Sequence, residues 1–281
     1  MSSDSPSKAS RLARSSYNSP FSRSGAPTPH PNTDPYVDLR AKALTTLIAM
    51  GFDPKTMVEH GVVWAEDQDP FGHVTQSRYM QFLGTCFHRV MESYDEYLTE
   101  EEYNQMILGK SIIPVVKKYE LDIKRQVKYP DALIAAYRED KIEPTRNNGT
   151  TVLFSITQQA VVAEVKGYTV YISTKSGRPV DIRTAGGGWQ RLFGGFTKLA
   201  EKSNVLKEAW DRDLKARKSA GSKLPALTAV NLDFNSNETM ASYSGSSSII
   251  SGPEIHHWLR RFRGVRVRKV DAIDIASSSG A

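Results

Sequence analysis

The clearest pattern of apolar and polar positions begins at Ser77, where apolar residues recur at steps of three and four. This spacing gathers apolar side chains on one side of an α-helix and leaves polar residues on the other. It predicts a helix of about six turns with a single buried stripe. The stripe consists of Met80, Leu83, Phe87, Val90, Met91, Tyr94 and Leu98.

After Gly109 the pattern changes to that of β-strands. Segments rich in Val, Ile, Tyr, Phe and Thr cover residues 112–123, 132–138, 150–159 and 161–174. Turn-forming clusters separate them at 129–131, 146–149 and 176–179. Because no helix intervenes between these segments, we expect an antiparallel sheet, with the long helix covering its apolar face.

Shorter elements flank this region. Residues 38–51 predict an amphipathic helix that Gly51 ends, and residues 61–66 predict a short apolar strand. Residues 189–210 predict a second helix, preceded by Gly186-Gly187-Gly188. These glycines lack the Lys-Ser/Thr pair of a phosphate-binding loop, so we interpret them as a hinge.

Composition limits the ordered part of the chain. Residues 1–33 are dominated by Ser, Pro and Arg, and residues 234–252 by Ser, Asn and Gly, so neither stretch buries enough apolar surface to offset ordering. The segment 36–210 is long enough for one core. The single cysteine, Cys86, excludes an intramolecular disulfide and fits a reducing compartment.

The net charge of +6 is concentrated near the ends of the chain. A basic run lies at Arg260, Arg261, Arg263, Arg266, Arg268 and Lys269. We interpret it first as a solvated tail, without specific nucleic-acid binding, and second as a contact of residues 255–269 with an anionic surface. Residues 5–33 contain no acid and several basic residues, which favours a mitochondrial transit segment over a cytoplasmic tail.

Chemistry is concentrated in the acidic turn that precedes the long helix. The turn reads Trp64-Ala65-Glu66-Asp67-Gln68-Asp69-Pro70-Phe71-Gly72-His73-Val74. It places carboxylates beside a helix N-terminus, where unpaired backbone N–H groups polarise a carbonyl. This arrangement suits cleavage of an ester or thioester.

The acidic turn, the long helix and the following strands resemble the hotdog fold, and more narrowly the thioesterases of the 4-hydroxybenzoyl-CoA type. Later echoes of the family pattern lie at 128–131, 162–164 and 177–180. The resemblance implies an α+β fold, with an antiparallel sheet wrapped around one long central helix and an appended C-terminal helix. The predicted organisation is a disordered or targeting segment 1–35, a helical extension 36–61, a hotdog domain 62–183, an appended helix 184–210, and a low-complexity and basic tail 211–281.

The resemblance also implies site residues. Asp69 corresponds to the acid that attacks the thioester or activates water, and the backbone N–H of Gln76 corresponds to the donor that holds the thioester oxygen. His73 is a candidate acid–base group or a residue that fixes the turn. Asp67 is expected to hold the turn by accepting backbone N–H groups. Coenzyme A enters as part of the substrate, and no cofactor or metal is expected.

Candidates to bind the CoA phosphates are Arg125, Lys128, Lys175 and Arg178. His256-His257 lacks further ligands at metal spacing. The substrate is expected to be an acyl-CoA or an acyl-carrier-protein thioester, and the family resemblance implies a homodimer or homotetramer. Many relatives carry an asparagine where Thr75 and Gln76 follow His73-Val74. The alternative is a weakly active or inactive hotdog module that binds acyl groups or assembles with a larger complex.

Overall fold

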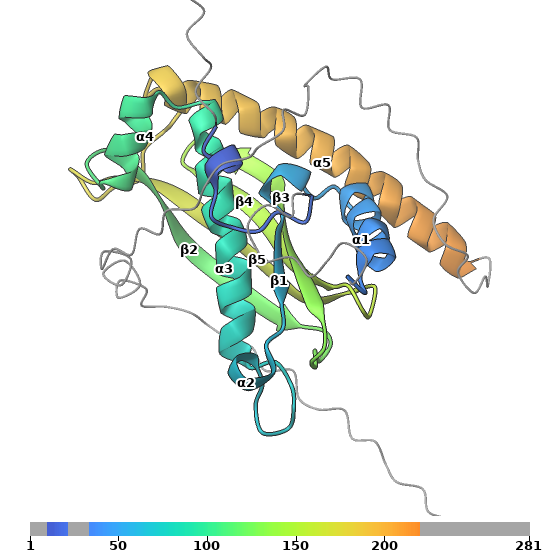
Figure 1. Ribbon diagram of the computed structural model, residues 1–281. Helices are drawn as coiled ribbons and strands as arrows, with labels where there is room; N and C mark the ends of the chain where they lie inside the picture. Colours follow the sequence, from blue (N-terminus) through green and yellow to red (C-terminus); the bar gives the residue numbers. More distant parts are fainter. Residues whose placement is uncertain (1–9, 22–33, 220–281) are drawn as a thin grey trace, which may run out of the picture.

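Antiparallel strands form one five-stranded sheet in the order β1-β3-β4-β5-β2 (Figure 1). The structure is a computed structural model that describes residues 10–21 and 34–219. The strands are β1 (Val58–Gly61), β2 (Ile112–Ile123), β3 (Ala132–Glu143), β4 (Arg146–Ser155) and β5 (Ala160–Ser173). The helices are η1 (Leu12–Arg14), α1 (Val37–Ala49), η3 (Pro54–Thr56), α2 (Trp64–Asp67), α3 (Gln76–Glu92), η4 (Ser93–Glu96), α4 (Glu100–Ile107) and α5 (Gly187–Ser219).

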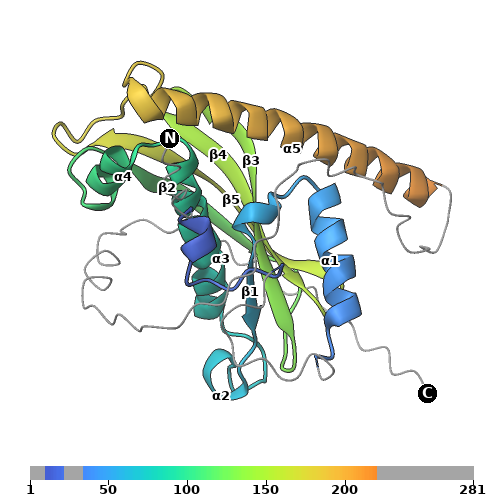
Figure 2. The same cartoon turned by 45° about the horizontal axis from the view of Figure 1, so that its top comes forward.

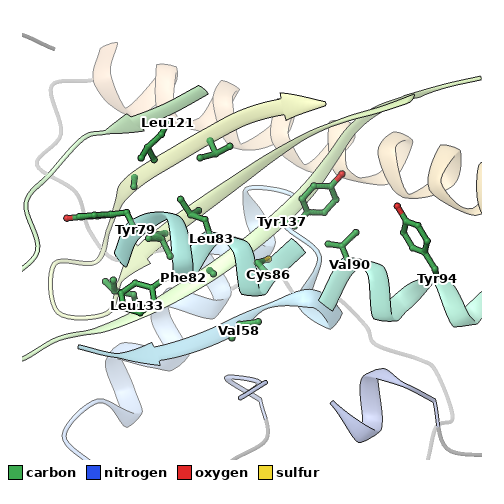
Figure 3. Packing of buried hydrophobic residues seen from close by; sticks show 14 of the residues in the cluster. Val58, Tyr79, Phe82, Leu83, Cys86, Val90, Tyr94, Leu121, Leu133 and Tyr137 are labelled. Atoms are coloured by element: carbon green, nitrogen blue, oxygen red, sulfur yellow. The ribbon is translucent and has the colours of Figure 1, made fainter. Parts of the chain in front are cut away.

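Helix α3 lies across the inner face of the curled sheet and forms the main core with it. Its buried side, which includes Tyr79, Leu83 and Cys86, packs against Leu133 of β3 (Figure 3). Leu153 of β4 belongs to the same buried cluster. The three- and four-residue spacing thus produces the expected buried stripe. The helix ends at Glu92, and a 3-10 turn follows where the sequence predicted continuation to Leu98.

Two further helices cover the outer face and one end of the sheet (Figure 2). Helix α1 packs Ala43 and Leu47 against outward-facing residues of β3 and β4, such as Ile134 and Phe154. Helix α5 packs on the sheet end and on η4 through residues such as Phe196, whose ring centroid lies 5.4 Å from that of Tyr94. It runs to Ser219, beyond the predicted boundary at 210.

Residues 10–21 lie against α3 on the side away from the sheet, although they fall within the predicted segment 1–35 (Figure 1). The Tyr17 hydroxyl is 2.6 Å from His88 Nδ1, and Arg89 Nη1 donates to Tyr17 O at 3.4 Å. The Glu59 N–H donates to Asn18 O at 2.8 Å, which occupies part of the free edge of β1. We call residues 10–21 the N-terminal strap.

The predictions for the two helices flanking the core and for the strand 112–123 are confirmed. The strand predicted at 61–66 is wrong: β1 ends at Gly61, and Trp64–Asp67 forms a short helix. The turn predicted at 146–149 is also wrong, because these residues pair within β4 and the chain reverses between Glu143 and Arg146. Strand β4 also ends earlier than predicted, at Ser155 rather than at 159.

One row of residues crosses the inner face from Glu139 through Gly149 and Gly167 to Tyr119. The two glycines sit where the chain needs room. A Cβ on Gly149 would overlap the ring of Tyr137, and one on Gly167 would overlap the carbonyl oxygen of Lys118. The centre of the inner face beneath α3 therefore lacks side chains at these two positions.

Candidate active site

The acidic turn is folded around Asp69, which is half-buried. Its Oδ1 accepts hydrogen bonds from the backbone N–H groups of Phe71 and His73, each at 2.9 Å. Its own N–H donates to His73 O at 2.8 Å, and Gly72, with φ of +75°, donates to Asp69 O. The carboxylate is thus held at a fixed place, and both N–H bonds go to only one of its two oxygens.

Asp67 has the structural role that the sequence predicted. Its side chain is buried, and Oδ2 accepts a hydrogen bond from the Val63 N–H at 2.6 Å. Its Oδ1 lies 2.8 Å from Arg78 Nε, and its carbonyl oxygen accepts from the Thr75 N–H. Asp67 therefore fastens both ends of the turn to the first turn of α3.

Helix α3 begins without a side-chain cap. Thr75 is the N-cap residue, and its hydroxyl accepts no hydrogen bond from a helix N–H. The Arg78 and Tyr79 N–H groups donate to Thr75 O. Within the described part of the chain, the N–H of Gln76, the first residue of α3, has no hydrogen-bond partner. An unpaired N–H at a helix start is a donor suited to an oxyanion.

The remaining residues of the turn are less constrained. His73 fixes the turn through its backbone, and no hydrogen bond of its imidazole occurs among the described residues. Glu66 is exposed, with Oε2 3.5 Å from Arg78 Nη2. Trp64 and Phe71 are also exposed, and the ring of Trp64 packs edge-on against Tyr129.

The candidate phosphate-binding residues fall into two groups. Arg125 and Lys128 lie on the β2–β3 connection, which contacts the turn through Val74 N to Val127 O and Tyr129 N to the Gln68 side chain. Lys175 and Arg178 follow β5 at the other end of the sheet. Ala163 pairs with Ile123, and the span from Ala163 to Ser173 is about 33 Å at ~3.3 Å per residue. A single copy of the chain therefore does not bring the two groups together.

A buried polar cluster, which the sequence analysis missed, lies between α3 and the sheet. Glu139, Tyr137, Asn147, Tyr94 and Tyr171 form it, and all are buried. Glu139 Oε2 accepts from the Tyr137 hydroxyl at 2.6 Å and from Asn147 Nδ2 at 3.2 Å. Burial raises the pKa of Glu139 to about 8. The sequence contains a sign of this cluster. Glu139 is an even number of residues from Leu133 and Tyr137, which face inward, so the two-residue period of a strand places it on the same face.

Residues 10–21 and 34–219 contain no cluster of His, Cys, Asp and Glu placed to hold a metal ion. In the same ranges none of the helices combines the length and apolarity needed to cross a bilayer. The basic run 260–269, the pair His256-His257 and the contact proposed for 255–269 lie outside the described residues.

A long central helix inside a curled antiparallel sheet, with an acidic turn at the helix start, defines a hotdog fold of the thioesterase class. Residues 63–190 match the family model of the thioesterase-like superfamily. Over this segment the chain is similar to that superfamily. No curated protein matches the sequence.

Solved structures with a similar chain path include two thioesterases and one CoA complex. The DHNA-CoA thioesterase of Staphylococcus aureus is 13% identical over 61% of this chain and 97% of its own, with a TM-score of 0.39. A 1,4-dihydroxy-2-naphthoyl-CoA thioesterase of Synechocystis is 14% identical over 49% of this chain and 94% of its own, with a TM-score of 0.40. A hypothetical protein of Staphylococcus aureus in complex with CoA is 10% identical over 51% and 84%, with a TM-score of 0.41. The strand order and the place of α3 across the inner face of the sheet define the hotdog fold of this chain.

Proposed function

We propose that the protein hydrolyses an acyl-CoA thioester, with Asp69 as the reacting carboxylate and the Gln76 N–H as the oxyanion donor. The observation that supports this is the pairing of a fixed half-buried carboxylate with an uncapped helix start on one short turn. Asp67 is committed to Arg78 and the Val63 N–H, which leaves Asp69 as the available acid of the turn.

The reaction balances with these groups alone. In one route Asp69 takes a proton from water, the water oxygen attacks the thioester carbonyl carbon, and the carbonyl electron pair moves to the oxygen that Gln76 N–H holds. The intermediate then expels the CoA thiolate, which takes the proton and leaves a carboxylic acid. In the other route the Asp69 carboxylate attacks the carbonyl carbon, the C–S bond breaks and CoA leaves as the thiolate, which gives a mixed anhydride. Water then cleaves the anhydride to the carboxylic acid and Asp69, and the proton left on Asp69 passes to the CoA thiolate. A single turnover in isotopically labelled water distinguishes them by whether the first product carries oxygen from Asp69.

The carboxylate is tested with Asp69→Asn, assayed against a panel of short, long and aromatic acyl-CoA substrates. The asparagine Oδ1 still accepts the Phe71 and His73 N–H groups, so the turn is expected to keep its fold. The matched control is Glu66→Gln, which removes an exposed carboxylate from the same turn. We expect Asp69→Asn to lose activity and Glu66→Gln to keep it. Equal activity of Asp69→Asn and wild type would refute the role of Asp69.

The oxyanion donor is tested with Gln76→Pro, which deletes the backbone N–H. Gln76 is the first residue of α3, where proline fits a helix, and Thr75 has the extended backbone that a following proline requires. We expect kcat to fall by about 100- to 1000-fold, the usual effect of losing one oxyanion donor. The control Gln76→Ala keeps the N–H and is expected to remain near wild type. If both variants are equally active, another donor holds the oxygen.

We further propose that two copies pair through β2. In the described part of the chain β2 is an edge strand that pairs only with β5, whereas the N-terminal strap occupies part of the β1 edge. An antiparallel β2 pair would bring the Lys175 and Arg178 end of one copy near the Arg125 and Lys128 end of the other. The two groups of basic residues then contact the same CoA, so in this proposal each CoA is bound by residues of both copies.

A further inference from the structure

Two partly exposed aromatic rings lie in contact beside the acidic turn. Trp64, the first residue of α2, is 65% exposed, and Tyr129, on the β2–β3 connection, is 48% exposed. Their ring centroids are 5.9 Å apart, and the ring planes meet at 81°. Val63 and Phe71 of the same segment are exposed as well, and exposed apolar side chains that gather in this way mark a binding surface. We call Trp64 and Tyr129 the aromatic corner.

A single polar side chain holds the aromatic corner in place. Gln68 Oε1 accepts the Tyr129 N–H at 2.8 Å, and Gln68 Nε2 donates to Trp64 O at 3.4 Å. Gln68 thus joins α2 to the β2–β3 connection and fixes both rings relative to Asp69, the next residue. Because both hydrogen bonds go to backbone atoms, replacing either ring leaves them intact. A surface that is already ordered loses little conformational freedom when a ligand binds.

The right-angled corner fits a flat aromatic group. A planar base that stacks on one ring turns its edge to the face of the other, and both arrangements are favourable contacts between aromatic rings. Stacking of a base on an aromatic side chain contributes about 1–3 kcal/mol and is open to every base, because each has a π-face. A pantetheine arm or a saturated acyl chain has no π-face and gains neither contact.

Positive charge lies on the connection that carries the second ring. Arg125 and Lys128 are exposed, and neither forms an ion pair with a described residue. Their neighbour Lys124 is instead paired with two acids, and the exposed acid of α2, Glu66, lies 3.5 Å from Arg78. Unpaired Arg and Lys side chains are common ligands of phosphate groups. The surface therefore combines the contacts that a base and its phosphates require, which is the chemistry of a nucleotide.

We propose that the aromatic corner binds the adenine of the CoA that carries the acyl group, with the CoA phosphates at Arg125 and Lys128. The inference rests on the proposed thioesterase function and extends it to the carrier of the acyl group. A carrier-protein thioester ends in the same pantetheine arm but has no adenine. The corner therefore makes CoA the preferred carrier, whereas Asp69 and Gln76 contact only the thioester, which both carriers share.

The first test measures binding without hydrolysis. Calorimetry with the full-length Asp69→Asn protein compares CoA with pantetheine, which lacks the nucleotide, and with adenosine bisphosphate, the nucleotide part of CoA. We expect CoA to bind about tenfold or more tightly than pantetheine, and the nucleotide to bind by itself but more weakly than CoA. Equal affinity for CoA and pantetheine would overturn the proposal. A nucleotide that binds as tightly as CoA would assign the corner to free nucleotide and overturn it as well.

The second test removes each ring with Trp64→Ala and Tyr129→Ala in the same full-length protein. We expect each change to weaken CoA binding by about fivefold or more and Trp64→Phe, which keeps an aromatic face, to restore most of the affinity. Binding of pantetheine by the same variants shows that the acidic turn is still folded. The matched control Trp210→Ala removes the same side chain from α5 and is expected to leave CoA binding unchanged. CoA affinity that is unchanged in both corner variants would refute the site.

The third test links the corner to catalysis. With Asp69 intact, kcat/KM is measured for an acyl-CoA and for the matching acyl-pantetheine. We expect a preference for the acyl-CoA of about tenfold or more, which Trp64→Ala reduces by raising KM for the acyl-CoA. Equal kcat/KM for the two substrates would overturn the inference and leave thioester hydrolysis standing. Hydrolysis of neither, together with CoA binding that depends on Trp64, would refute the proposed function and leave the corner as a CoA site.

Discussion

Glu139 is an inward-facing carboxyl in the middle of the core. Burial raises its pKa to about 8, although hydrogen bonds from Tyr137 and Asn147 lower it and Asp140 adds repulsion. Burial and the Glu139 charge in turn raise the pKa of Tyr137. The folded protein thus binds a proton on Glu139 that the unfolded chain, with a glutamate pKa of about 4.3, releases.

The sign of the pH dependence follows from this difference. The stabilising effect is complete below about pH 4 and is lost as the pH rises through about 8. We expect the free energy of unfolding to fall over this interval by up to about 1.4 kcal/mol per unit of pH, and Glu139→Gln to flatten the curve. Urea unfolding across this pH range measures it, with the exposed Glu120→Gln as control. Parallel curves for wild type and Glu139→Gln would contradict the assignment.

Asp67 and Glu66 give a second contrast between neighbouring carboxylates. Asp67→Ala removes the partner of Arg78 Nε and the acceptor of the Val63 N–H, so we expect a loss of about 2–4 kcal/mol in the free energy of unfolding. Glu66→Ala touches an exposed pair and is expected to cost less than about 0.5 kcal/mol. Chemical denaturation of both variants checks this, and equal losses would mean that Asp67 does not anchor the turn.

The elements show where sequence patterns carry enough information. The long helix and the strand 112–123 follow from periodicity because each buries one side. The strand predicted for residues 61–66 is wrong because a run of Gly, Val and Trp favours a strand. In the structure Asp67 accepts the Val63 N–H and closes the segment into a helical turn. The Asn147-Asn148-Gly149 cluster looks like a turn, but Gly149 is there for the close approach of Tyr137.

The candidate site was only partly predictable for a related reason. The acidic turn is contiguous, so the family resemblance names Asp69 and Gln76 as candidates from the sequence, and their roles stay predictions. The polar cluster draws Tyr94 from η4, Asn147 from β4 and Tyr171 from β5, which only the fold brings together. Polar residues in a strand also suggest a solvated face until the neighbours of that strand are known.

Helix α5 contains two adjacent glycines with different surroundings. A Cβ on Gly194 would meet nothing within 4 Å, whereas one on Gly195 would overlap the ring of Tyr97. We expect Gly194→Ala to stabilise the protein by up to about 1 kcal/mol through helix propensity. We expect Gly195→Ala to destabilise it by about 1–3 kcal/mol through overpacking. Thermal unfolding of the pair tests this, and stabilisation by both would show that α5 does not pack closely on Tyr97.

At the scale of the whole molecule, this chain itself covers part of each broad face of the hotdog layer. Helix α1 packs on the outer face over β3 and β4, and the N-terminal strap lies on α3 opposite the sheet. A tetramer formed from two dimers needs one of these faces, whereas pairing through β2 needs neither. The proposed assembly therefore stops at two copies.

We expect light scattering with size-exclusion chromatography to give the mass of a dimer. Hydrogen exchange of the β2 backbone is expected to slow as protein concentration rises, while exchange in β4, which is paired on both sides within one copy, stays constant. A monomeric mass at high concentration, or a stable tetramer, would contradict the proposed pairing.

Cys86 lies at the centre of α3 with no exposed surface, and its Sγ donates to Thr56 O at 3.4 Å. Burial raises the pKa of its thiol well above the ordinary value. Oxidants and alkylating agents react with thiolate, and the sequence contains no second cysteine. The thiol redox state of the surroundings therefore does not change Cys86 in the folded protein. A thiol reagent reacts with Cys86 only after α3 separates from the sheet.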